Sequence, residues 1–137
     1  MPADPSRVQE VVGDRYRIAE AIGRGLFSTV YRATEAATGR AVAIKVFDFD
    51  PRAFPAATRQ IADVLHRTAA LEHPAIIAPG ALELRDAAAF YVMPLMRGSV
   101  ADLLREQGAL STSRVETIVH RVADALDHAP WTQEQKK

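Results

Sequence analysis

The sequence predicts an α+β fold: a five-stranded antiparallel sheet with one helix after its third strand, followed by two more helices. Two glycines, Gly23 and Gly25, stand one residue apart between alternating apolar residues, which is typical of a tight turn between antiparallel strands. Further short runs rich in β-branched and aromatic residues follow on both sides of a longer segment with helical spacing. Two segments with helical spacing come last. These three observations define the fold class.

The strands are placed by period-two alternation and by the residues that end them. Residues 1–13 contain two prolines and no periodic pattern, so we expect a flexible N-terminal arm. Tyr16, Ile18 and Ile22 fall on one side of the first strand. Pro79 stands where the fourth strand should pair, which suggests a distorted edge because proline donates no ladder hydrogen bond. The other strands are expected at residues 29–34, 41–47, 81–85 and 89–93.

The first two helices are predicted from apolar spacing and from the residues that end them. Residues 55–72 repeat Ile61, Leu65 and Ala69 at intervals of four, which gives a stripe that faces the sheet. Residues 99–107 form a short helix, ended by a glycine.

The last helix is predicted over residues 113–128. Ser113, followed three residues later by Glu116, has the pattern of a capping box. The apolar face of this helix consists of Val115, Ile118, Val119, Val122 and Leu126. Burial of each aliphatic side chain contributes roughly 1.5–3 kcal/mol. We therefore expect self-association through this helix, fraying of the segment, or docking to a separate polypeptide.

Composition excludes several classes of protein. The chain has 137 residues, 48% of them hydrophobic and 25% charged, with a formal net charge of zero. This balance gives no reason to expect a nucleic-acid or anionic-membrane partner. The absence of cysteine excludes disulfides and thiolate metal sites and fits a reducing compartment. Residues 1–7 lack the apolar region of a signal peptide, and the longest apolar run is too short to span a bilayer. We expect a soluble, cytoplasmic protein.

The glycine turn is paired with a lysine at an informative spacing. Lys45 lies 22 residues after Gly23, inside the run Val-Ala-Ile-Lys of the third strand. The chain has 14 arginines and only three lysines, so a lysine within an apolar strand favours a site that needs a compact ammonium. The combination resembles the protein-kinase family, whose members have a glycine-rich loop and a lysine on the third strand. Residues 14–18 and 91–93 are similar to the bacterial, eukaryotic-like Ser/Thr branch.

The resemblance implies a nucleotide site. Backbone amides of the glycine loop would cover the phosphates of ATP, and Lys45 would contact the α- and β-phosphates. Val30 and Ala43 would press on the adenine, Met93 would be the gatekeeper, and backbone groups of Pro94 and Met96 would pair with the adenine edge. The implied nucleotide-binding residues are Ile22, Gly23, Gly25, Ser28, Val30, Ala43, Lys45, Met93 and Met96. Ser28 replaces the third glycine of the family's loop. Without the motif, the apolar members of this set would be interpreted as ordinary sheet core.

The sequence also departs from the family. Active kinases pair the strand lysine with a glutamate on the first helix, and the matching position here is Val64. Asp63 is adjacent but lies about 100° around the helix. The His-Arg-Asp loop, the metal-binding Asn, the Asp-Phe-Gly segment and the Ala-Pro-Glu segment do not occur in these 137 residues. We therefore expect weak or conditional ATP binding, Mg²⁺ only with a C-lobe supplied from elsewhere, and no catalysis by this chain alone.

The resemblance divides the chain into four parts: a flexible arm at 1–13, an ATP-binding N-lobe at 14–97, helices of an incomplete, truncated C-lobe at 98–130, and an atypical tail at 131–137. Three interpretations remain open. The chain is the nucleotide-binding portion of a Ser/Thr kinase separated from its catalytic half, a stand-alone pseudokinase-like interaction module, or a non-functional remnant. The four histidines suggest no metal site: His73 is the turn residue before a proline, and the others lie on predicted helices without carboxylate or histidine partners at ligand spacing.

Overall fold

The computed structural model describes residues 4–85 and 87–129 and contains two compact units. The described residues of the first unit are 4–70, 78–85 and 87–95, and those of the second are 71–77 and 96–129. The predicted tail at 131–137 lies outside the described residues. None of the described helices has the length and apolar character needed to cross a membrane.

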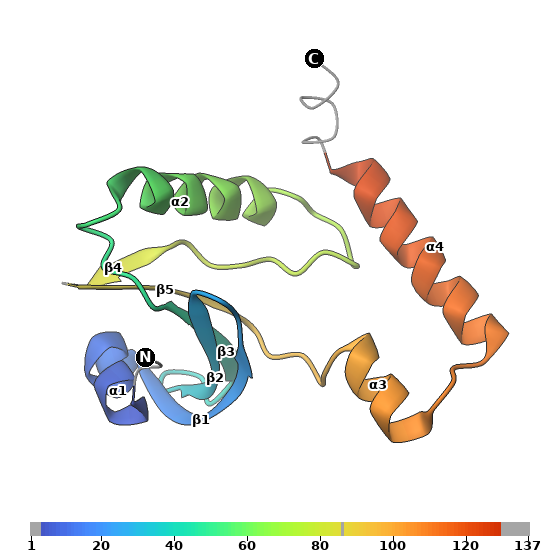
Figure 1. Ribbon diagram of the computed structural model, residues 1–137, viewed down its shortest axis with the longest axis horizontal. Helices are drawn as coiled ribbons and strands as arrows, with labels where there is room; N and C mark the ends of the chain where they lie inside the picture. Colours follow the sequence, from blue (N-terminus) through green and yellow to red (C-terminus); the bar gives the residue numbers. More distant parts are fainter. Residues whose placement is uncertain (1–3, 86, 130–137) are drawn as a thin grey trace, which may run out of the picture. The chain divides into compact units, whose positions relative to one another are not determined.

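The first unit is built on the predicted five-stranded antiparallel sheet, with strand order β1-β2-β3-β5-β4 (Figure 1). The strands are β1 (Tyr16–Arg24), β2 (Ser28–Glu35), β3 (Ala41–Phe47), β4 (Glu83–Arg85) and β5 (Ala88–Pro94). The third strand has its predicted bounds. The fourth begins two residues later than predicted, after Gly80. The Gly80 amide donates to the carbonyl of Val92 at 2.7 Å, and a Cβ on Gly80 would lie 3.1 Å from that oxygen.

One face of the sheet carries the hydrophobic core. Its buried residues alternate along the strands, and they pack with partly buried side chains of the same face. The cluster is Val8, Val12, Tyr16, Tyr31, Ala33, Ile44, Val46 and Phe90. Two of these residues, Val8 and Val12, come from outside the sheet. They belong to helix α1 (Pro5–Val12), which covers this face.

The prediction of a flexible arm over residues 1–13 is therefore wrong for α1. Asp4 caps the helix by accepting from the Ser6 amide, and Pro5 occupies a first-turn position, where a missing N–H costs little. The side-chain amide of Gln9 donates to the carbonyl of Tyr16 at 2.7 Å and its oxygen accepts from the amide of Ile18 at 2.8 Å. These contacts attach the helix to the start of β1.

The first strand does not keep simple alternation. Its pairing with β2 shifts between Ile18 and Ala21 and again between Ala21 and Gly23. Ile22 is 44% exposed, whereas Tyr16 is 5% exposed. The single side predicted for Tyr16, Ile18 and Ile22 is therefore not kept along the whole strand, because an irregular pairing breaks the period of two.

Helix α2 (Pro55–Ala69) lies over the other face of the sheet (Figure 1). It ends three residues before the predicted boundary. Of its predicted stripe, Leu65 is buried, Ile61 is half-buried and Ala69 is exposed. A cavity of about 410 Å³ separates α2 from the sheet and is lined by Phe47, Ala57, Gln60, Ile61, Val64, Leu65 and Tyr91.

The second unit contains α3 (Val100–Gln107) and α4 (Thr112–His128). The predicted capping box at Ser113 is wrong, because the helix begins one residue earlier and Ser111 is its cap, accepting from the amide of Arg114. A capping box occurs instead on α3, between Ser99 and Asp102. Four residues of the predicted apolar face are about half exposed: Val115, Val119, Val122 and Leu126.

Candidate functional site

The glycine loop is a tight connection between β1 and β2. The Gly25 amide donates to the carbonyl of Ser28 at 2.8 Å, and a Cβ on Gly25 would lie 3.1 Å from the Ser28 hydroxyl oxygen. At the tip, Leu26 is 93% exposed and Phe27 is 70% exposed. The carbonyl of Phe27 accepts from the amide of Asp48 at 2.7 Å, which ties the loop to the end of β3. The loop therefore has a fixed base and an exposed apolar tip.

Strand register brings most of the predicted site residues onto one face. Directly opposite residues of an antiparallel pair share a face. Gly23 is opposite Val30, Val30 is opposite Lys45, and Ala43 is opposite Met93. Ser28 joins this set because it is two residues from Val30 on β2.

Helix α2 covers this face of the sheet. The core cluster lies on the opposite face, where the intervening residues of the same strands point. Ser28 is buried at 6% exposure and Ala43 at 4%, whereas Val30, Lys45 and Met93 are half-buried. Gly25 lies in the turn itself. Met96 belongs to the second unit and is about half exposed.

Within residues 4–85 and 87–129, no ion pair involves Lys45. Asp63 pairs with Arg67 one turn along α2, at 2.9 Å. Val64, the residue that the sequence matches to the family's glutamate, is 52% exposed and lines the cavity under α2. The Lys45 ammonium lies instead 5.8 Å from the centre of the Phe47 ring.

Tyr91 is the neighbour of Lys45 on β5. Burial raises the pKa of the Tyr91 phenol above its ordinary value. The group is therefore a neutral phenol at physiological pH, and it adds no negative charge beside the lysine.

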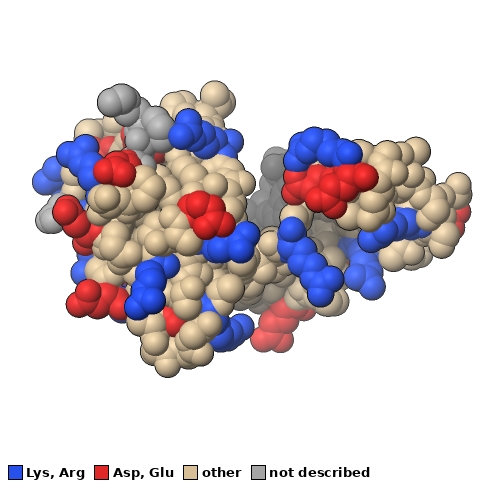
Figure 2. Space-filling view, turned by 90° about the horizontal axis from the view of Figure 1, so that it is seen from below, with Lys and Arg blue, Asp and Glu red and all other residues tan. Residues whose placement is uncertain are grey.

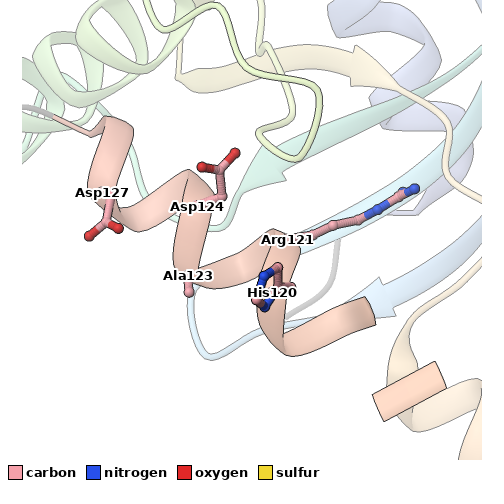
Figure 3. Close-up of a pocket in the computed structure, with 5 residues that line it drawn as sticks. All are labelled: His120, Arg121, Ala123, Asp124 and Asp127. Carbon is pink, nitrogen blue, oxygen red and sulfur yellow. The ribbon is translucent and has the colours of Figure 1, made fainter. Parts of the chain in front are cut away.

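The second unit has a surface hollow of about 350 Å³, whose described lining residues belong to α4: His120, Arg121, Ala123, Asp124 and Asp127. The side chains of Arg121, Asp124 and Asp127 point in different directions and do not converge on one point (Figure 3). Within the described ranges, no three metal-ligand side chains gather into a site. This hollow therefore offers no arrangement for chemistry.

His73, which the sequence places in the turn before Pro74, has a carboxylate partner. Its Nε2 lies 2.8 Å from a carboxylate oxygen of Asp124, and its ring centre is 5.3 Å from that of His128. The Nδ1 atom of His73 accepts from the amide of Ala75 at 3.0 Å. The partners stand 51 residues apart, so no local sequence pattern could have indicated the pair.

Charge is mixed on the surface. On the face shown in Figure 2, basic and acidic side chains of the described residues alternate without a broad area of one sign. One ion pair joins Arg15, the residue before β1, to Glu83 of β4 at 2.8 Å. Exposed pairs of this kind contribute little to stability.

A model of the protein kinase domain family matches residues 16–129. Among similar proteins, a probable serine/threonine-protein kinase of Corynebacterium efficiens is 32% identical over 122 residues, covering 85% of this chain and 18% of that protein. CBL-interacting protein kinase 20 of rice is 28% identical over 123 residues, covering 85% of this chain and 26% of the relative. Serine/threonine-protein kinase PrkC of Bacillus subtilis is 27% identical over 123 residues, covering 89% of this chain and 19% of PrkC. The chain thus spans about a quarter or less of the length of these relatives.

Proposed function

The chain belongs to the protein kinase domain family, and on that premise we propose that its sheet unit is the ATP-binding portion of a serine/threonine protein kinase. The observation that carries the proposal is the shared face of Gly23, Val30, Lys45, Ala43 and Met93. On this face, a glycine loop suited to phosphate binding, the Lys45 ammonium and a small apolar surface lie together.

Each group has a physical role in this proposal. The amides of the glycine loop approach the phosphates closely because Gly23 and Gly25 lack a Cβ. The Lys45 ammonium forms charge-assisted contacts with phosphate oxygens. Val30 and Ala43 contact the adenine, Met93 limits the depth of its pocket, and Ile22 borders it. Ser28 holds the base of the loop through its contact with Gly25.

We propose further that this 137-residue chain does not transfer phosphate alone. Phosphoryl transfer needs a carboxylate that positions the acceptor hydroxyl and ligands that hold Mg²⁺ against the phosphates. The sequence contains none of the motifs that supply them. Mg²⁺ would therefore bind only together with C-lobe residues that these 137 do not include.

A second function is favoured by the exposed side of α4. Val115, Val119, Val122 and Leu126 form a half-exposed apolar stripe, and Val64 stands in place of the glutamate of active kinases. We propose that a separate catalytic part or a second copy of the chain covers this stripe. In a pseudokinase-like module, that contact would be the function and nucleotide would be secondary.

Calorimetric titration with ATP tests the primary proposal. We expect weak binding, with a dissociation constant of about 1 mM, which corresponds to about 4 kcal/mol. Lys45→Ala should abolish it, whereas Lys136→Ala with Lys137→Ala, which removes the other two lysines, should leave it unchanged. If Lys45→Ala binds ATP as the parent does, the proposed site is wrong. In the same samples, labelled ATP with Mg²⁺ and an acceptor protein should leave no label on protein.

A further inference from the structure

Among the described residues, no carboxylate forms an ion pair with Lys45. Its neighbours across the sheet are Val30 and Tyr91. The carboxylate nearest in sequence to the family's glutamate position, Asp63, is paired with Arg67. A lysine without a partner has several rotatable bonds and would lose side-chain entropy on binding an anion. Some other group must fix the ammonium if it is to be positioned before a ligand arrives.

The position of Phe47 allows its ring to fix the Lys45 ammonium. It lies two residues after Lys45 on β3, so both side chains leave the same face of the strand. The ammonium nitrogen is 5.8 Å from the ring centre, within the range of a cation–π interaction. Both residues are half-buried, so the ring face is partly shielded from water.

The Phe47 ring is itself fixed by other aromatic side chains. Its centre is 6.0 Å from the Tyr91 ring and 5.6 Å from the Phe49 ring. Phe49 in turn meets Phe54 edge-on at 6.0 Å, with an interplanar angle of 82°. Ring pairs at these separations are favourable and restrict rotation. The row Phe54, Phe49, Phe47 and Tyr91 therefore presents one defined ring to the lysine.

We propose that the ring of Phe47 positions the Lys45 ammonium, in the role that a carboxylate from α2 would otherwise have. Unlike a carboxylate, the ring carries no charge, so the lysine keeps its full positive charge for an anion. The use of this charge for nucleotide phosphate rests on the proposed function, but the contact between ring and ammonium does not.

Nuclear magnetic resonance of ¹³C-dimethylated lysines tests the contact without nucleotide. The chain has only three lysines, and Lys45→Arg identifies the signal of Lys45. We expect the ring to shift that signal upfield in the parent and in Phe47→Tyr. Phe47→Leu should return it to the position of an exposed lysine, and Phe54→Leu, the same change two rings away, should not. A parent signal at the exposed position, or one that Phe47→Leu leaves unmoved, overturns the proposal.

Binding of ATP tests the positioning role. A cation–π contact at a partly exposed site corresponds to a two- to five-fold change in affinity, so Phe47→Leu should weaken binding by about that factor while Phe47→Tyr restores it. Unchanged affinity in Phe47→Leu, with the signal of Lys45 moved, overturns the positioning role. If the parent binds no ATP but its Lys45 signal is shifted upfield and responds to Phe47→Leu, the proposed function fails and the ring contact stands.

Discussion

The burial of helix α1 predicts that shortening its core side chains will lower the free energy of unfolding. Val8 and Val12 are 1% and 2% exposed, and both belong to the core cluster of the sheet. Val→Ala removes two methyl groups, each worth about 0.8 kcal/mol of transfer free energy, and the cavity left behind adds to the loss. We expect each substitution to lower the free energy of unfolding by about 2 kcal/mol, and the double variant by about 4 kcal/mol.

Urea unfolding followed by circular dichroism measures this loss. For a denaturant slope of about 2 kcal/mol per molar, the midpoint of the double variant should fall by about 2 M. Leu26→Ala is the matched control, because Leu26 is 93% exposed and its removal should change the free energy by less than about 0.5 kcal/mol. A double variant as stable as this control would refute the assignment of α1 to the core.

Two further predictions concern α4. The double substitution Ile118→Glu with Val122→Glu should convert a self-associating chain to a monomer in sedimentation, while the sheet unit stays folded. A parent chain that is already strictly monomeric, with α4 protected from hydrogen exchange, would contradict the proposal that a partner covers α4. Ser111→Ala should destabilise the helix by about 0.5–2 kcal/mol, whereas Ser113→Ala should have little effect, as judged by exchange of the first-turn amides. Equal effects of the two serine changes would mean that Ser111 is not the cap.

The sheet was predictable because its signals are local. The bounds 41–47 of β3 follow from a run of apolar residues, interrupted by Lys45 alone, between turn residues, and the glycine loop marks the end of β1. Register then follows from the hairpin connections, so the placement of Val30 beside Lys45 is a consequence of the same pattern.

The core was harder to predict because part of it comes from a short helix. Val8, Val11 and Val12 have helical spacing, and Asp4 with Pro5 is a recognisable start, but eight residues make a weak periodic signal. Its burial depends on an unfilled face of the sheet, which only the assembled fold reveals. The pair of His73 with Asp124 joins positions 51 residues apart and leaves no local pattern at all.

Chemical-shift mapping of ATP on ¹⁵N-labelled protein tests the proposed ATP site, because it locates the ligand residue by residue. We expect the amide resonances of Gly23, Gly25, Lys45 and Met93 to shift with one common dissociation constant, while those of α1 on the opposite face do not shift. Shifts confined to α4, or spread equally over both faces of the sheet, would contradict it.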